Sequence, residues 1–284
     1  MPAIADIARF FASHPLTRDA PLGAWARFLS WQVRSRLRDE IIVPWIGGQK
    51  LAVRRGMTGA TGNVYAGLHE FADMMLVLHV LQPGDLFLDI GANVGSYTVL
   101  AAGVREATTW AFEPDADTVR ALRRNIDLNG LGSRVIVHET ALGECDGAVP
   151  FTFGMDTMNR VAGDGDANVR TVPVRRLDGL IGSAKPLMIK MDVEGYEPSV
   201  VRGAQGLLAQ NGLKVVALET LSEEIVTMLS RHGFQRAYYD PFHRALSTAP
   251  SGPPASNAVF VKDWDCVTGR LRGAPAISLL GKKI

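Results

Sequence analysis

The sequence has few cysteines, no long hydrophobic run and almost no net charge. Cys145 and Cys266 lie far apart, without a CxxC motif or neighbouring histidines, so neither a disulfide framework nor a zinc site is indicated. The longest apolar run, near Met74 to Leu81, is far shorter than the roughly 20 residues of a membrane-spanning helix. A net charge of +1 provides no overall field that would favour binding of nucleic acid.

The length and composition are those of one large α/β unit with an elaborated end. With 284 residues, of which 47% are hydrophobic, the chain can bury a sizeable core, which excludes disorder. The opening residues, MPAIADIARFF, include Asp6 and Arg9, which a secretory signal does not tolerate, so we expect a cytoplasmic protein. We predict a basic N-terminal extension of helical and β structure over residues 1–62, a main domain over 63–264 and a C-terminal tail over 265–284.

The first 60 residues are locally basic, with nine Lys and Arg residues against four acidic ones. An amphipathic helix is predicted within this segment, because apolar residues recur at helical spacing between arginines, at Trp25, Phe28, Leu29, Val33 and Leu37. Two interpretations stay open. The helix packs across the main domain with its arginines in water, or it contacts a membrane surface or another anionic partner, such as glycan-assembly machinery at the inner membrane face.

From Gly67 onward, helical segments alternate with short apolar runs that end in glycine turns or acids. This alternation is typical of an α/β fold, in which a mainly parallel sheet is covered by helices on both faces. The chain ends with a further pair of strands around a loop rich in Pro, Gly and Ser. Seven strands are predicted for the sheet, at residues 85–90, 109–112, 134–138, 187–191, 213–218, 234–239 and 258–262, and shorter strand pieces, VPFTF and VRTVPV, are predicted within residues 145–175.

The residues that follow the first two strands of the alternation suggest a ligand site, because ligands of such sheets bind beyond the carboxyl ends of the strands. Asp89 leads into the turn Gly91-Ala-Asn-Val-Gly95, whose glycines let the backbone approach a ligand. Glu113 ends the next strand, where a carboxylate can accept hydrogen bonds from both hydroxyls of a ribose. The combination favours an adenosine ligand, and the alternative for the turn alone is a tight connection from strand to helix.

Two adenosine cofactors compete for this site. A nicotinamide dinucleotide uses the pattern G-x-G-x-x-G, but here Asn93 replaces the second glycine and Ser96 the third. Asp89 would repel a pyrophosphate, whereas S-adenosylmethionine offers hydrogen-bond donors and a cationic sulfonium. The sequence therefore favours S-adenosylmethionine.

Five segments together resemble the FkbM-type methyltransferases: DIGANVGSYTVLAA, AFEP, NIDLNGL, ETALGE and IKMDVEGYE. The resemblance implies a seven-stranded Rossmann-like sheet with an antiparallel last strand, S-adenosylmethionine as methyl donor, and transfer to a hydroxyl. It places the methionine part at Asp89 and the glycine turn, the ribose at Glu113 and the adenine at residues 139–141. The full set of predicted cofactor-binding residues is Glu70, Asp89, Gly91, Ala92, Asn93, Gly95, Ser96, Glu113, Pro114, Glu139, Thr140, Ala141 and Asp192.

Methyl transfer to an alcohol requires a base, and we predict Asp192 and Glu194 as the catalytic residues. Two residues apart on an extended segment, they would face the same side, and the pKa of one would rise toward neutrality. Alternatively, Glu194 caps the following helix and Asp192 orders the turn, while Lys190 pairs with these acids. Other possible bases are Glu70, Glu219, His69 and His243. We predict no metal, because no compact ligand cluster is visible and this acid pair would need a third ligand.

An irregular segment at residues 145–175 is a candidate for the acceptor pocket, because aromatic faces beside polar groups suit a carbohydrate. A β-hairpin extension of the sheet is the alternative interpretation. The segment contains Phe151, Phe153, Met155, Asp156, Thr157, Met158, Asn159 and Arg160. A second segment, residues 238–244, could close the other side of the cleft.

The predicted function is that of an S-adenosylmethionine-dependent O-methyltransferase that acts on a hydroxyl, foremost on a sugar in a glycan or glycoconjugate. The acceptor could instead be a polyketide or macrolide-like metabolite. An NAD-dependent oxidoreductase and a non-catalytic adenosyl-binding protein are the two alternatives from other classes.

Overall fold

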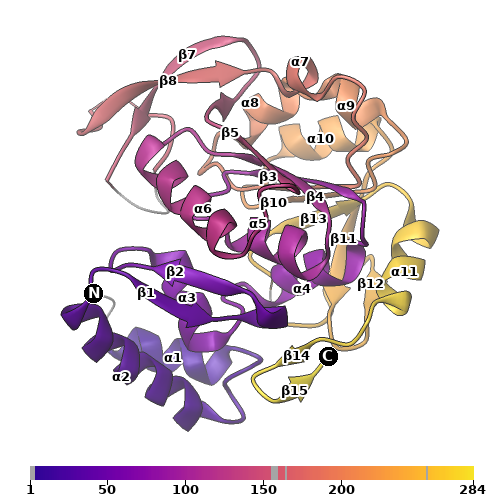
Figure 1. Ribbon diagram of the computed structural model, residues 1–284. Helices are drawn as coiled ribbons and strands as arrows, with labels where there is room; N and C mark the ends of the chain where they lie inside the picture. The colour runs from indigo at the N-terminus through magenta and orange to yellow at the C-terminus, as the bar shows by residue number, and fades with distance from the viewer. Residues whose placement is uncertain (1–3, 155–158, 164, 254) are drawn as a thin grey trace.

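The computed structural model describes residues 4–154, 159–163, 165–253 and 255–284. A sheet of eight strands lies at its centre, in the order β12-β11-β13-β10-β9-β3-β4-β5 (Figure 1). The five strands from β10 to β5 are parallel, and β13 runs antiparallel to both of its neighbours. The strands are β3 (Leu86–Ile90), β4 (Thr108–Phe112), β5 (Val135–His138), β9 (Met188–Met191), β10 (Val215–Leu218), β11 (Gln235–Asp240), β12 (Ala245–Ser247) and β13 (Ala258–Val261).

The predicted α/β class is confirmed, and all seven predicted strands form. The eighth strand, β12, was not predicted. It pairs antiparallel with β11 and extends the sheet at one edge, so that Tyr239 lies opposite Leu246.

Successive side chains of each strand point to opposite faces of the sheet, and a layer of helices packs on each face. On β9, Met188 packs into one apolar cluster, whereas Ile189 and Met191 pack into the other. The first layer contains α4 (Phe71–Val80), α5 (Ser96–Val99) with the π-helical turn Leu100–Val104, and α11 (Trp264–Gly273). The second contains α7 (Leu177–Ile181), α8 (Glu197–Arg202), α9 (Gln205–Ala209) and α10 (Glu223–Arg231).

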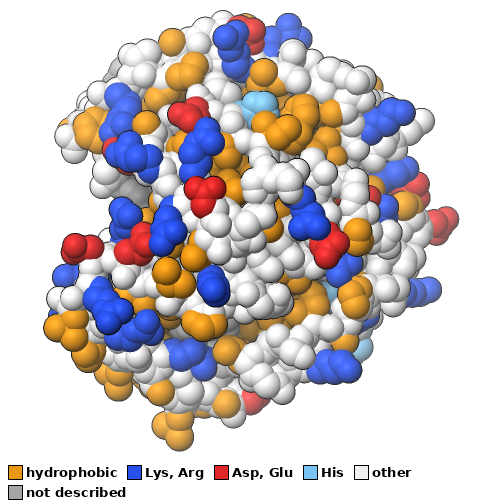
Figure 2. Space-filling view, in the orientation of Figure 1, with side chains coloured by type: hydrophobic (Ala, Val, Ile, Leu, Met, Phe, Trp, Pro, Cys, Tyr) orange, Lys and Arg blue, Asp and Glu red, His pale blue; other side chains and the backbone are white. Residues whose placement is uncertain are grey.

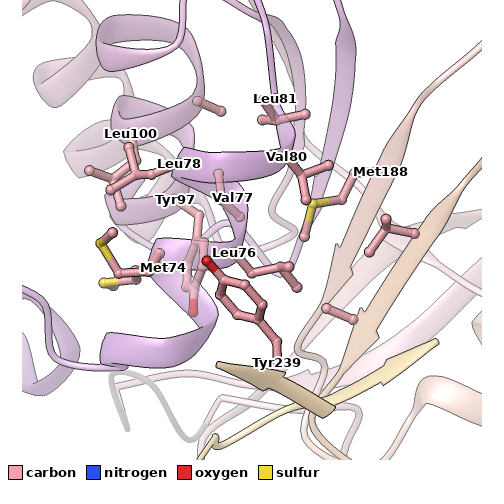
Figure 3. Packing of buried hydrophobic residues seen from close by; sticks show 14 of the residues in the cluster. Met74, Leu76, Val77, Leu78, Val80, Leu81, Tyr97, Leu100, Met188 and Tyr239 are labelled. Atoms are coloured by element: carbon pink, nitrogen blue, oxygen red, sulfur yellow. The ribbon is translucent and has the colours of Figure 1, made fainter. Parts of the chain in front are cut away.

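Helix α4 is apolar apart from Asp73 and His79, and all of its residues are buried, as expected of a helix covered on every side. Figure 3 shows its side chains against Tyr97 on one side and Met188 of the sheet on another. Its single histidine, His79, lies 2.5 Å from the Tyr239 hydroxyl, between Nδ1 and Oη. This contact connects α4 to the far edge of the sheet.

The N-terminal segment packs on the main domain, mainly on α6 (Ala116–Leu128), through a hairpin of β1 (Ile41–Pro44) and β2 (Lys50–Val53). Helix α6 ends beneath this hairpin, and two asparagines of the predicted NIDLNGL segment hold it. Asn125 Oδ1 accepts the Ala52 N–H at 2.7 Å, and Asn129 Oδ1 accepts the Lys50 N–H at 2.7 Å. Asn125 also donates to the Val94 carbonyl at 2.8 Å, so one side chain joins the N-terminal hairpin to the glycine turn.

The predicted amphipathic helix forms as α2 (Pro21–Leu37), but its apolar residues divide between two faces. Trp31 is buried against the hairpin, and Ala24 packs on α1 (Ile4–Ser13). Leu29 and Leu37, by contrast, are exposed. Among the described residues, no helix combines the length and apolarity needed to cross a membrane.

Candidate active site

A pocket of about 240 Å³ lies beyond the carboxyl ends of β3, β4, β9 and β10. The position agrees with the rule for ligand sites of open parallel sheets. Helix α3 (Thr58–Ala66) and the first residues of α4 complete its wall. Eleven of the predicted site residues line it: Glu70, Gly91, Ala92, Asn93, Ser96, Glu113, Pro114, Thr140, Ala141, Asp192 and Glu194.

Three predicted residues are not brought to the pocket surface. Asp89 is fully buried beneath the turn, and its Oδ2 accepts the Thr98 hydroxyl at 2.5 Å. Gly95 begins α5 in a left-handed conformation, with φ of 90°. Glu139 is exposed and pairs with Arg123 at 2.8 Å. The pattern of strands in the sequence did not show which residues beside the strand ends face the pocket.

Gly91 is required by a contact between two strand ends. Its φ is 76°, and a Cβ atom there would lie 1.8 Å from the Asp192 carbonyl oxygen. The backbone N–H groups of Gly91 and Ala92 both donate to the Phe112 carbonyl at 3.0 Å. Glycine at this position therefore lets the turn after β3 lie directly against the chain that leaves β9.

Glu113 is buried, and each carboxylate oxygen accepts a backbone N–H. The Asn93 N–H donates to Oε2 at 3.0 Å, and the Asp115 N–H donates to Oε1 at 2.9 Å. Burial raises the pKa of Glu113 to about 7, and the charges of Asp115 and Asp89 act in the same direction. Each oxygen keeps a second lone pair for a donor in the pocket.

Three carboxylates converge on the opposite wall. One oxygen from each of Asp192, Glu194 and Glu219 lies within 4.8 Å of the others. Glu219 follows β10, whereas the other two follow β9. Sequence analysis predicted no metal because Asp192 and Glu194 would need a third ligand. Glu219 supplies a third carboxylate beside them, so that argument does not hold. The cluster also contains a cation, because Lys190 Nζ lies 2.7 Å from Asp192 Oδ2.

The acids of this cluster titrate differently. Burial alone would raise the pKa of Asp192, but the Lys190 ammonium and a hydrogen bond with Glu219 lower it below its ordinary value. The same hydrogen bond, followed by burial and the Asp192 charge, raises the pKa of Glu219 to about 8. Glu219 therefore carries the proton that this pair shares at neutral pH.

Glu194 reaches the cluster by a route other than the predicted one. Its φ is 53°, so the segment after β9 is a tight turn and not an extended strand. The alternative that Glu194 caps the next helix is not observed, since the N-cap residue of α8 is Tyr196 and α8 has no side-chain cap hydrogen bond. Burial and the negative charges of Asp192 and Glu197 raise the pKa of Glu194.

A further chain of polar contacts connects this cluster to α4. Lys190 Nζ lies 4.6 Å from the centre of the Tyr97 ring, and the Tyr97 hydroxyl donates to Glu70 Oε2 at 2.7 Å. Asn63 Nδ2 donates to Ser96 Oγ at 3.1 Å, and its Oδ1 accepts the His69 N–H at 2.7 Å. These contacts fix the α4 side of the pocket relative to the glycine turn.

The family model described as the methyltransferase FkbM domain matches residues 89–236, just over half of the chain. The chain belongs to the FkbM methyltransferase family. The matched span contains the glycine turn, Glu113 and all three carboxylates of the acidic cluster.

The chain shares modest sequence identity with individual named proteins. The chain is 26% identical over 146 residues to the hexuronic acid methyltransferase AglP of Haloferax volcanii. The aligned region covers 50% of this chain and 59% of the length of AglP. The methyltransferase FkbM structure from Methylobacillus flagellatus KT has a TM-score of 0.43 at 16% identity, over 83% of this chain and 59% of that one. The structure of a precorrin-6y C5,15-methyltransferase from Geobacter metallireducens has a TM-score of 0.40 at 16% identity. The match covers 69% of this chain and 90% of that one.

The irregular segment forms two strands, β7 (Gly147–Thr152) and β8 (Val169–Arg175), of a separate three-stranded sheet, and β6 (Ala141–Leu142), just before the segment, is the third strand. A hairpin therefore forms as the alternative interpretation predicted, but it does not extend the main sheet. Phe151, Asn159 and Val161 of this segment line the pocket. Phe153 packs under Arg170, and Arg160 pairs with Asp166 at 2.8 Å. The predicted pocket residues Met155, Asp156, Thr157 and Met158 lie outside the described residues.

The two histidines considered as bases differ in position. His69 lines the pocket, and burial lowers its pKa. His243 is exposed beside Asp240, with Nδ1 and Oδ2 2.6 Å apart, and is not part of the pocket wall.

Sequence analysis overlooked Tyr97 and Asn63, which both line the pocket. Both were visible as polar residues inside the motifs, Tyr97 in DIGANVGSYT and Asn63 in the lead-in to α4. Their contacts across the pocket gave no signal in the sequence.

Proposed function

We propose that this methyltransferase uses S-adenosylmethionine as donor and methylates a hydroxyl of a sugar in a glycan or glycoconjugate. The sugar acceptor is suggested by the relative named a hexuronic acid methyltransferase. The observation that carries the hydroxyl assignment is the convergence of Asp192, Glu194 and Glu219 on one wall of the pocket.

The residues of the pocket fit this donor. Glu113 supplies acceptors for the ribose hydroxyls, and Thr140 with Ala141 forms the wall assigned to the adenine. The acidic cluster suits a cationic sulfonium electrostatically. Bound S-adenosylmethionine supplies an electrophilic methyl group, and the protein contributes alignment and removal of a proton.

An alcohol must lose its proton as its oxygen forms the bond to the methyl carbon and the carbon–sulfur bond breaks. Asp192 is engaged by Lys190 and by the proton it shares with Glu219. We therefore assign the proton to the Glu194 carboxylate, whose raised pKa makes it a stronger base than an ordinary glutamate. A carboxylate acceptor would need no base, and the ionised Glu194 carboxylate would repel it.

The donor is tested by calorimetry with S-adenosylmethionine, S-adenosylhomocysteine and NAD. We expect binding of the two adenosyl ligands at micromolar concentrations and none of NAD. Binding of NAD alone, or hydride transfer with a nicotinamide cofactor, would contradict the donor assignment.

The base is tested with Glu194→Gln, with exposed Glu223→Gln as a matched control on α10. Turnover should fall by about 100-fold or more in the first variant, with unchanged affinity for the donor. Methylated products from a panel of sugar nucleotides and lipid-linked glycans identify the acceptor by mass spectrometry. Full turnover in Glu194→Gln would remove this residue as the base.

A further inference from the structure

The five most exposed large hydrophobic side chains of the described residues all lie on the first two helices. Four of them belong to α2: Leu22 (83% exposed), Leu29 (59%), Val33 (60%) and Leu37 (77%). The fifth, Ile4 of α1, is 73% exposed. Successive residues of a helix are separated by about 100°, so the four α2 residues and Ala26 form one stripe along 17 residues.

This stripe faces away from the protein, because the opposite face of α2 is already packed. Ala24, Trp31 and Ser35 are buried there. Arg27 donates to the Tyr65 carbonyl of α3 at 2.7 Å, which fixes the rotation of α2 about its axis. The exposed apolar face is thus a fixed feature of the surface.

Cations flank the stripe. Arg34 and Arg36 project on either side of it and Arg38 follows directly, while α2 contains no acidic residue. Arg36 donates to the Gln32 side chain at 2.9 Å, and in the described part of the chain no carboxylate pairs with any of these three arginines. Figure 2 shows hydrophobic side chains along the lower left edge of the molecule, over α2, with Lys and Arg side chains beside them.

We propose that the outer face of α2 docks on an anionic phospholipid surface, with its apolar stripe in the interface and its arginines on the headgroups. A helix with one apolar face and an arginine-rich border lies in the plane of a membrane interface in this way. A second copy of the chain fits less well, because a two-fold contact would bring the arginine borders of the two copies together.

Docking through α2 has a consequence for the pocket. Helix α3 packs on α2, and its residues Thr58 to Ala60 form part of the pocket wall. The pocket would therefore lie close to the bilayer, where a lipid-linked sugar could reach it. This consequence rests on the proposed function, whereas the docking itself can be measured without donor or acceptor.

The test is co-sedimentation of the full chain with vesicles, either of phosphatidylcholine alone or mixed with phosphatidylglycerol. We expect binding to the mixed vesicles at about 0.05 M salt and its loss at about 0.5 M. Replacing Arg34, Arg36 and Arg38 by Gln should weaken binding about fivefold per arginine, or roughly 100-fold in total.

A second variant tests the stripe itself. Leu29→Gln with Val33→Gln and Leu37→Gln should lower the partition coefficient at least about tenfold. The matched control is Leu221→Gln with Val226→Gln, which changes two exposed hydrophobic side chains at α10. Thermal unfolding of all variants within a few degrees of the wild type shows that they are folded.

Three results of the vesicle experiments would overturn the proposal. They are an absence of binding to the mixed vesicles at low salt, wild-type binding by the stripe variant, and an equal loss in the control. A lipid-free dimer that the stripe variant dissociates in sedimentation velocity would also overturn it, in favour of a second copy. None of these results depends on whether the pocket binds S-adenosylmethionine.

Discussion

Affinity for an adenosyl ligand should depend on pH through Glu113. Its pKa in the free protein is raised to about 7 by burial, so the side chain is mostly protonated at pH 6 and mostly ionised at pH 8. Ribose hydroxyls donate hydrogen bonds, and an ionised carboxylate accepts them more strongly than a carboxylic acid does. Binding therefore favours the ionised form, and affinity should increase with pH across this window.

The size of the effect follows from the fraction that is ionised. With a pKa of about 7, this fraction changes from about one tenth at pH 6 to about nine tenths at pH 8, so the dissociation constant should fall about tenfold. Glu113→Gln removes the charge. A hydrogen bond to a charged group contributes about 1.5–3 kcal/mol, so affinity at pH 8 should fall by about 10-fold to 100-fold.

Calorimetric titration with S-adenosylhomocysteine at pH 6, 7 and 8 measures both effects. The variant should bind with the same affinity at all three pH values, and that affinity should be equal to the affinity of the wild type at pH 6 or up to about tenfold weaker. Glu219, with a pKa of about 8, also titrates in this pH range. Comparison with the variant shows how much of the pH dependence of the affinity is due to Glu113. A wild-type affinity that does not change with pH, or a variant that binds like the wild type at pH 8, would refute the assignment of Glu113 to the ribose.

Three further predictions concern the walls of the pocket. Gly91→Ala should lower the free energy of unfolding by about 3 kcal/mol or more, and so lower the melting temperature, because its Cβ would meet the Asp192 carbonyl. The control, Gly269→Ala, has open space around it in α11 and should leave the melting temperature equal or higher. Lys190→Met should move the acidic limb of the pH–rate profile to higher pH, because loss of the ammonium raises the pKa values of the acids beside it; an unchanged limb contradicts this. Chelation with EDTA should leave turnover unchanged, since Lys190 and the shared proton already offset the charge of the carboxylates; a loss of turnover that Mg²⁺ restores would show a metal site.

Local pattern was enough to predict the class of the fold and the position of the pocket. Apolar runs that end in Gly91 and Glu113 mark strand ends, and parallel strands bring such ends to one edge of the sheet. Most of the predicted site residues therefore line a single pocket, although they are dispersed over the chain. The eighth strand gave no comparable signal, because β12 has only three residues at an exposed edge.

The direction of each side chain was less accessible from the sequence. Asp89 belongs to the glycine motif, yet it points into the protein and accepts a hydrogen bond from Thr98. Glu194 reaches the acidic cluster through a left-handed turn that an extended-strand argument does not predict. One residue of displacement along a strand or turn reverses the direction of a side chain, so a motif identifies the neighbourhood more reliably than the contact.

The sequence by itself determined the alternation of strands and helices, the glycine turn and the acids at the strand ends, because these depend on local periodicity and on backbone conformations that few residues adopt. Only the tertiary structure decided that Glu219 joins Asp192 and Glu194, and that α2 buries Trp31 while it exposes Leu29 and Leu37. Contacts between β9 and β10, and the choice of which helix face is covered, depend on segments that meet only after the sheet has formed. The free energy gained when a side chain is buried depends on which segments pack against it in the folded protein, and the residues of a single segment do not determine this.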